Sequence, residues 1–381
     1  MKSFLYSLVF VVLAACAGGE PPRESAEPQE LLAQFMPEAM ADGIVKVAIV
    51  RNLAAGDHTR QFLEGCVSEG RALGFTVDTF VTDGNRDMCR SLLARITEAD
   101  YDGLILSNGE ADFTYTSLKG AAEKGIKIVT FDAIPYEDGD TSKPILAGVT
   151  STAQEDSRLA RISLDSIVSY FPSDRLPVRV IRVWSGPGMP PLDRRLLVYN
   201  EFVQEGKIRE IAHISPRDFS FARSGTREAL TALLARFPPG SVDAIWASYD
   251  EFAKGCIDAL TDAGRRDIIM ASIDISNDDM KLMLANPHIW VSTAAVDPKL
   301  IGIVNIRLLA AKLAGEETPQ AYNFNVQNVH TVSLSPSITM ANIASVVPGW
   351  GQEAGLFDSY PWMEELKKAV AEKTVRGNRS K

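Results

Sequence analysis

The chain has 381 residues, of which 46% are hydrophobic and 23% are charged, so it is long enough for two globular domains of ordinary composition. Its formal net charge of −10 argues against a nucleic-acid-binding protein, because such a protein needs a basic surface. Beyond the N-terminal segment, no uninterrupted apolar stretch is long enough to span a bilayer.

The N-terminal segment is predicted to be an export signal and a tether rather than part of the fold. Lys2 precedes an apolar core at Phe4–Ala15 that is too short to cross a membrane. The core ends in Leu13-Ala14-Ala15-Cys16, which resembles the lipobox of bacterial lipoproteins. That resemblance implies cleavage after residue 15 and lipidation of Cys16; the alternative is an ordinary signal followed by an incidental cysteine. Residues 16–43 are rich in proline and glutamate and are predicted to form a flexible tether.

The next part of the chain alternates short apolar runs with amphipathic segments. Such alternation indicates β-α-β units with parallel strands, since parallel strands need long crossover connections. The predicted strands are Lys46–Val50, Thr76–Val81, Gly103–Ser107, Ile126–Phe131 and Ile145–Val149, and the predicted helices are Thr59–Leu73, Asp87–Ala99 and Thr114–Lys124.

Two of these strands end in polar residues. Gly103–Ser107 is followed by Asn108, and Ile126–Phe131 is followed by Asp132. Ligands of parallel α/β sheets bind beyond the carboxyl ends of the strands. The sequence therefore predicts a pocket at this edge, although Asp132 has the alternative role of a simple turn cap.

The pattern restarts after a helix that begins near Ser151-Thr152 and ends near Tyr170. The fold class predicted is therefore α/β, with two doubly wound parallel-sheet lobes. The segment after Val347 has no predicted role in the fold. Predicted strands here are Val178–Val183, Arg209–Ile214, Val242–Ala247, Ile268–Ile273 and Trp290–Ala294, with helices at Asp193–Gln204, Ser224–Arg236, Asp250–Ala263, Asp278–Leu284 and Pro298–Leu313 and extended segments at Tyr322–Val326 and Thr331–Leu334.

Five short sequence phrases occur in an order that resembles one family. Between Ile44 and Ile343 the chain resembles the periplasmic sugar-binding proteins of ABC transporters, of the ribose/galactose-binding type. The phrases are YDGLI at Tyr101–Ile105, GIKIVTFD at Gly125–Asp132, VDAIWASYD at Val242–Asp250, SID at Ser272–Asp274 and the closing segment Ser335–Ile343.

The resemblance implies a type I periplasmic binding protein fold, in which three strands join two lobes. It places the crossings near Thr150-Ser151, Val296-Asp297 and Asn328–His330. The N-terminal lobe would comprise residues 44–150 and 297–328, and the C-terminal lobe residues 151–296 and 329–346, with a C-terminal extension at 347–381. The resemblance further implies a monomer without a cofactor that delivers its ligand to an ABC permease.

The same resemblance supplies candidate ligand-binding residues. Sugar hydroxyls both donate and accept hydrogen bonds, so carboxylates, amides and arginines suit them, while aromatic rings cover the apolar sugar face. Arg194 is an alternative to Arg195, and Asp250 has the alternative role of a helix N-cap. The candidates are Arg51, Asn52, Asn108, Asp132, Arg195, Tyr249, Asp250 and Asp274.

One departure from the family concerns the tip of the first loop. The family often places aromatic residues there, whereas this chain has Asp57-His58. His58 is accordingly predicted to be an exposed polar residue. We expect a small sugar or polyol as the ligand, bound between the two lobes. The candidate arginines Arg51 and Arg195 leave a sugar acid or another small anion open.

Other functions lack the motifs they need. An enzyme on the same fold, such as a hydrolase that uses Asp132 and Asp274 as an acid–base pair, is an alternative. No nucleophile motif, metal-ligand spacing or dinucleotide fingerprint accompanies these residues, so we expect neither catalysis nor a bound metal. A related transcriptional repressor would need an N-terminal DNA-binding helix pair, and an export signal stands there instead. A periplasmic sensor that partners a membrane histidine kinase or chemoreceptor stays open as an alternative to transport. Either protein would act in the periplasm or at the cell surface.

Cys66, Cys89 and Cys256 are predicted to be buried, unpaired thiols.

Overall fold

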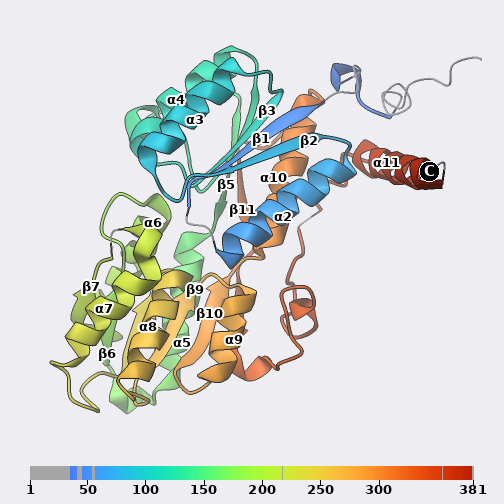
Figure 1. Ribbon diagram of the computed structural model, residues 1–381. Coiled ribbons are helices and arrows are strands. Elements are labelled where there is room, and N and C mark those ends of the chain that lie inside the picture. The colour runs from blue at the N-terminus through green and yellow to red at the C-terminus, as the bar shows by residue number, and fades with distance from the viewer. Residues whose placement is uncertain (1–34, 41–44, 54–55, 217, 354, 380–381) are drawn as a thin grey trace, which may run out of the picture.

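The computed structural model describes residues 35–40, 45–53, 56–216, 218–353 and 355–379, and these form two α/β lobes. Figure 1 shows the lobes one above the other, each with a twisted central sheet between helices. The predicted fold class, two doubly wound lobes, is confirmed. The predicted signal segment, Cys16 and most of the predicted tether lie outside the described residues.

The first sheet has six strands, and all of its pairings are parallel. Alternate residues of β1 face opposite sides: Val47 and Ile49 join one hydrophobic cluster, while Ala48 and Val50 join another. This explains why the strands read as continuous apolar runs, since both faces are buried. In spatial order the strands are β11 (Ala321–Phe324), β5 (Val149–Gln154), β4 (Lys127–Phe131), β3 (Gly103–Ser107), β1 (Lys46–Arg51) and β2 (Thr76–Val81).

Helices cover both faces of this sheet. The helices α3 (Arg86–Glu98) and α4 (Ala111–Glu123) lie on one side, and α2 (Asp57–Ala72) and α10 (Pro298–Leu313) lie on the other. The last two pack closely through glycines: a Cβ on Gly302 would lie 2.2 Å from the carbonyl oxygen of Phe62. Only glycine permits this approach of two helix backbones.

The second sheet repeats this arrangement, except that its last strand is antiparallel. One face packs against α5 (Asp156–Tyr170) and α6 (Pro190–Gln204), and the other against α7 (Ala222–Leu234), α8 (Asp250–Asp262) and α9 (Asn277–Ala285). In spatial order the strands are β12 (Gln327–His330), β10 (Trp290–Ala295), β9 (Ile269–Ile273), β8 (Ala244–Ala247), β6 (Val178–Val183) and β7 (Ile208–Ile214).

The chain passes between the sheets three times. The first passage follows Gln154 rather than Thr150-Ser151, because β5 continues to Gln154 in the first sheet, where it pairs with both β4 and β11. The second passage lies between Ala295 and Pro298, at the predicted position. The third lies between β11 and β12, at residues 325–326, and so precedes the predicted Asn328–His330.

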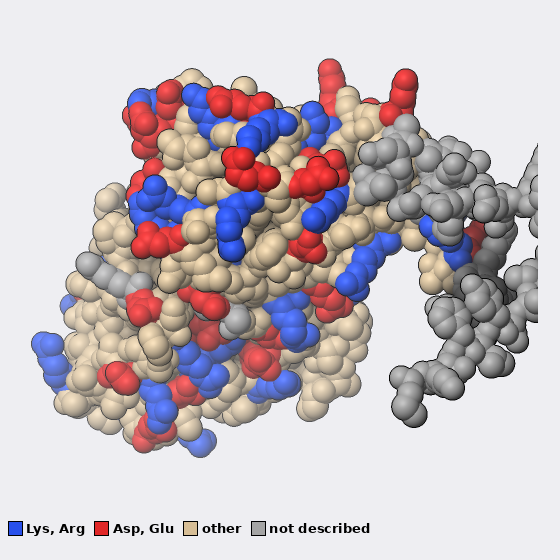
Figure 2. Space-filling view, turned by 45° about the horizontal axis from the view of Figure 1, so that its top comes forward, with Lys and Arg blue, Asp and Glu red and all other residues tan. Residues whose placement is uncertain are grey.

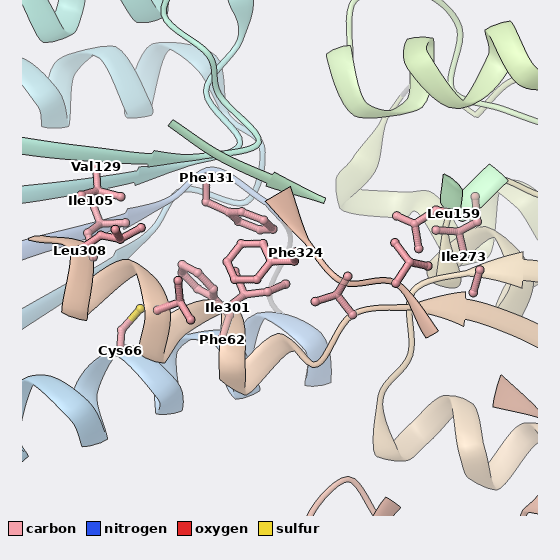
Figure 3. Packing of buried hydrophobic residues seen from close by; sticks show 14 of the residues in the cluster. Phe62, Cys66, Ile105, Val129, Phe131, Leu159, Ile273, Ile301, Leu308 and Phe324 are labelled. Carbon is pink, nitrogen blue, oxygen red and sulfur yellow. The ribbon is translucent and has the colours of Figure 1, made fainter. Parts of the chain in front are cut away.

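Aromatic packing stabilises the first lobe beside these passages. Phe62, Phe131 and Phe324 come from α2, β4 and β11 and lie together in Figure 3. The ring centroids of Phe62 and Phe131 are 5.7 Å apart, and those of Phe131 and Phe324 are 6.0 Å apart. Such contacts add to the stabilisation from apolar burial alone.

The C-terminal extension, for which the sequence predicted no role, ends in the helix α11 (Trp362–Arg379) beside α2 (Figure 1). Leu366 is fully buried there, and Lys367 Nζ lies 3.1 Å from the Glu69 carboxylate on α2. The last helix of the extension therefore packs on the first lobe, whereas Val347 and Trp350 pack in a hydrophobic cluster of the second lobe. Among the described residues, no helix has the length and apolar character to cross a membrane. Cys66, Cys89 and Cys256 are buried and unpaired, as predicted.

Candidate functional site

A cavity lies between the two lobes at the carboxyl ends of their strands. It contains about 420 Å³ of empty space, a volume that includes open solvent. Side chains of both lobes line it. The first lobe contributes Arg51, Leu53, His58, Asn108, Phe131, Asp132 and Gln154, and the second contributes Met189, Pro191, Leu192, Arg195, Phe219, Tyr249 and Asp274.

Three polar residues that line this cavity share the same backbone conformation. Asn108, Asp132 and Asp274 each follow the last residue of a strand and have φ angles of 59°, 52° and 73°. Asn and Asp tolerate this left-handed region better than other non-glycine residues. The turn lets a short polar side chain leave the strand end and face the space between the lobes.

Arg51 ends β1 and lies 1% exposed beside the cavity. Its Nη1 donates to Ser107 Oγ at 2.5 Å and to Asn108 Oδ1 at 2.6 Å, and its guanidinium lies 4.8 Å from the centre of the Phe62 ring. No carboxylate forms an ion pair with it among the described residues. Its Nε is buried without a hydrogen-bond partner. Arg51 is thus a rigidly held cation whose Nε donor is unused.

His58 lies in the first turn of α2 and is only 9% exposed, so the prediction of an exposed side chain is wrong. Its Nδ1 lies 3.2 Å from Nη2 of Arg51, which is a donor in every state. Nδ1 must therefore accept, and the ring proton sits on Nε2. Nε2 is buried without a partner, which makes it a free donor at the cavity. Burial and the Arg51 charge lower the pKa of His58 to about 3, so the ring stays neutral near pH 7.

Arg195 projects from α6 into a network of carboxylates. Its Nε donates to Asp156 Oδ1 at 2.8 Å, and its Nη1 donates to the Ser248 carbonyl at 2.7 Å and to Asp274 Oδ2 at 3.2 Å. Arg194 donates to the other oxygen of Asp156 at 2.6 Å but does not line the cavity. Of the two candidates, the structure places Arg195 at the cavity, while Arg194 helps to fix Asp156.

Asp132 and Asp274 approach the cavity from opposite lobes. Both are nearly buried, at 4% and 5% exposure. Asp132 Oδ1 accepts the backbone N–H of Gln154 at 3.2 Å, whereas Asp274 Oδ1 has no partner. Burial, reinforced by the nearby Asp156 carboxylate, raises the pKa of Asp132 to about 7. Asp132 can therefore exchange a proton near neutral pH.

Comparison with known proteins shows the family to which the chain belongs. The model of a periplasmic binding protein domain family matches residues 47–317. The chain belongs to the periplasmic binding protein family. This periplasmic binding protein is also 34% identical to a sugar ABC transporter protein from Yersinia enterocolitica, whose crystal structure superposes with a TM-score of 0.80 over 88% of this chain and 98% of that one.

A second solved structure has lower identity but similar coverage. The 5-methylthioribose transporter solute binding protein from Thermotoga lettingae, in complex with 5-methylthioribose, is 25% identical and has a TM-score of 0.75 over 85% of this chain and 98% of that one. A solute binding protein from Agrobacterium vitis, bound with α-D-tagatopyranose, is 16% identical, has a TM-score of 0.67 and covers 77% of this chain and 97% of its own, and so shows the fold alone. No curated protein matches the sequence.

Two of the candidate ligand residues lie off the cavity of this periplasmic binding protein. Asn52 is buried under the strand ends, where it donates to the Asn108 carbonyl at 3.1 Å and accepts from Thr82 Oγ1 at 2.7 Å. Asp250 is 1% exposed at the start of α8, where its Oδ1 accepts the Glu251 N–H at 2.9 Å. Both geometries suit structural roles. The candidates that line the cavity are Arg51, Asn108, Asp132, Arg195, Tyr249 and Asp274.

The sequence reasoning missed several lining residues. Gln154 could have been found as the polar end of β5, had that strand been extended by five residues. His58 has no local signal, because its burial depends on Arg51. The apolar residues Leu53, Met189, Pro191, Leu192 and Phe219 lie in loops and a helix start, where composition does not distinguish a lining residue from an ordinary loop residue. Among the described residues, no group of three or more His, Cys, Asp or Glu side chains is placed to hold a metal ion.

Proposed function

We propose that this protein is the sugar-binding component of an ABC importer, and that it binds a small neutral sugar or polyol between its lobes. The observation that carries the proposal is the facing pair Asp132 and Asp274, which end corresponding strands of opposite lobes and line one cavity. One ligand can contact both carboxylates only from between the lobes. The ligand is then delivered to a membrane permease.

Hydrogen-bonding capacity at the cavity suits sugar hydroxyls. The side chains of Arg51 and His58 have buried donors without partners, and those of Gln154 and Asp274 have buried acceptors without partners. Unpaired polar atoms at buried positions are costly, so a ligand that both donates and accepts stabilises this arrangement. A hydroxyl group does both, and a carboxylate accepts from two adjacent hydroxyls.

The charges at the cavity favour a neutral ligand over a sugar acid. Two guanidinium groups, Arg51 and Arg195, face two carboxylates, Asp132 and Asp274. Asp156, which does not line the cavity, forms an ion pair with Arg194. An added carboxylate would raise the net negative charge beside Asp132, whose pKa is already raised.

The lobes touch each other through hydrogen bonds, which supports closure around the ligand. Asp57 Oδ2 on α2 accepts the backbone N–H of Asn277 on α9 at 2.7 Å. Ser220 Oγ donates to the Asp83 carbonyl at 3.3 Å. These cross-lobe contacts form only when the lobes approach, so ligand binding favours the closed form if the ligand bridges both lobes. A permease then distinguishes the loaded protein by its shape.

The cellular setting is part of the proposal. The Leu13–Cys16 sequence supports a lipid anchor at Cys16, with the binding lobes on the tether of residues 16–43. The protein would then work in the periplasm or at the cell surface, beside its permease. Figure 2 shows acidic and basic side chains interspersed on the face in view, without a broad basic field. That mixed surface suits transient protein contacts rather than nucleic-acid binding.

The ligand bound in a similar structure supports a sugar as the ligand of this protein. The Thermotoga lettingae protein holds 5-methylthioribose, a modified pentose. A thermal-shift screen over pentoses, hexoses, 5-methylthioribose, polyols, sugar acids and nucleosides tests the proposal, since a ligand raises the melting temperature by mass action. We expect at least one neutral sugar or polyol to bind with one-to-one stoichiometry in calorimetry.

The same experiment separates binding from catalysis. We expect the bound sugar to be recovered unchanged by mass spectrometry after long incubation, because the described lining residues include no serine, threonine or cysteine that could act as a nucleophile. Failure of every neutral sugar and polyol to bind would contradict the proposal. Conversion of the ligand to a product would contradict it as well and would indicate an enzyme.

A further inference from the structure

The polar and apolar residues of the cavity occupy different parts of it. In the second sheet, β9 and β8 lie nearer to the connecting strands than β6 and β7 do. Asp274 follows β9, whereas Met189 and Leu192 follow β6 and Phe219 follows β7. In the second lobe the lining therefore changes from polar to apolar towards the outer edge, except that Arg195, which also follows β6, reaches back to Asp274. In the first lobe the apolar Phe131 lies beside Asp132.

The apolar part is continuous and is built by both lobes. Leu53 belongs to the first lobe, yet it packs in the same hydrophobic cluster as Leu192 of the second lobe. Met189 and Phe219 pack against that cluster. We name Leu53, Met189, Pro191, Leu192 and Phe219 the apolar wall.

None of the unused hydrogen-bonding atoms at the cavity belongs to the apolar wall. The buried atoms without partners at this cavity belong to Arg51, His58, Gln154 and Asp274, none of which is in the wall. A ligand hydroxyl that faced the wall would lose water and find no side-chain partner there. A methyl or alkyl group in the same place would gain from apolar burial.

An outer groove continues beyond the wall. Leu53, Met189 and Phe219 line both the cavity and this groove, which also includes Gly186 and Pro187. The wall therefore separates the enclosed polar part from a space that opens to solvent.

We propose that the natural ligand is a small sugar with one apolar end, either a deoxy sugar or a sugar with an alkyl or alkylthio substituent. Its hydroxyls contact Asp132, Asp274 and their polar neighbours, and its apolar end lies against the apolar wall. This inference rests on the proposed function, because it names the sugar class for the same cavity.

Matched sugar pairs test the inference. Calorimetry compares D-ribose with 5-deoxy-D-ribose and D-galactose with D-fucose, its 6-deoxy analogue. We expect the deoxy member of at least one pair to bind about tenfold tighter or more, because the lost hydroxyl need not be desolvated. If the fully hydroxylated member binds equally or more tightly in every pair that binds, the inference is wrong while the proposed function stands. If no neutral sugar or polyol binds at all, both fail.

A pair of variants tests whether the apolar wall causes the preference for deoxy sugars. Met189→Gln places an amide at the wall with little change in size, and we expect it to reduce the deoxy preference at least about threefold. Leu197→Gln is the control, because Leu197 lies on α6 but is 64% exposed and off the cavity. An unchanged preference in Met189→Gln, with an apo melting temperature equal to that of Leu197→Gln, would overturn the role of the wall.

Discussion

Replacing Asp274 with asparagine should weaken sugar binding without unfolding the protein. Asp274 has a φ of 73°, a conformation that asparagine also tolerates, so the backbone should not change. Its Oδ1 is buried and unpartnered, and its Oδ2 accepts from Arg195. The amide offers one acceptor instead of two and no charge. Either the ligand hydroxyl or Arg195 then loses a charge-assisted partner.

The expected loss follows from the strength of such bonds. Hydrogen bonds to charged groups contribute roughly 1.5–3 kcal/mol, and part of this remains with a neutral amide, so we expect a loss of about 1–3 kcal/mol. At 1.4 kcal/mol per tenfold change, affinity falls about 5- to 140-fold. Apo stability should change little, because Arg195 keeps Asp156 at 2.8 Å and the Ser248 carbonyl at 2.7 Å.

Calorimetry with the tightest ligand of the sugar screen measures this loss, and thermal unfolding of the apo variants checks the fold. Asp250→Asn is the matched control, since Asp250 is as deeply buried at a neighbouring strand end but does not line the cavity. Its affinity should equal that of the wild type. Unchanged affinity in Asp274→Asn, or a larger loss in Asp250→Asn than in Asp274→Asn, would refute the placement of the site.

Three further predictions concern anchoring, packing and pH. Cys16→Ser should move the protein from the membrane fraction to the soluble fraction; equal distribution of wild type and variant would contradict lipidation. Gly302→Ala should destabilise the fold by roughly 1–3 kcal/mol or more in urea unfolding, because its Cβ would lie 2.2 Å from the Phe62 carbonyl oxygen. Gly225→Ala is the control: its Cβ would have no atom within 4 Å, so it should not destabilise the fold. The folded-state pKa of Asp132, about 7, lies above its ordinary value, so the folded protein holds a proton that the unfolded chain releases. The free energy of unfolding of the wild type should therefore decrease as the pH rises from 5 to 7. This decrease should be steeper than that of Asp132→Asn by up to about 1.4 kcal/mol per pH unit. Parallel pH profiles of the two proteins would contradict this prediction.

Much of the fold and part of the site could be predicted because the signals are local. Strand β4 reads as an apolar run whose last residue precedes Asp132, and β9 reads the same way before Asp274. A run of apolar residues that ends in an Asp shows where the strand ends, and parallel sheets place such ends at one edge. The position of these two carboxylates at the cavity therefore follows from short sequence segments.

Other features depend on residues far apart in the chain. Strand β5 extends to Gln154 because β11, more than 160 residues later, pairs with it. His58 is buried because Arg51 and the second lobe close around the start of α2, which a loop-like local sequence does not reveal. Asp250 and Asp274 are both candidates from the sequence and both follow strands of the second sheet, yet only Asp274 lines the cavity. Local pattern thus identifies strand ends but not which side chain at each end meets the ligand.

The central claim is that a sugar binds between Asp132 and Asp274. The crystal structure of the protein with the tightest ligand from the screen tests this most directly. The account predicts electron density for one sugar in the cavity, with its hydroxyls within hydrogen-bonding distance of both carboxylates and of Arg195. A sugar bound outside the cavity, or contacts confined to one lobe, would contradict it.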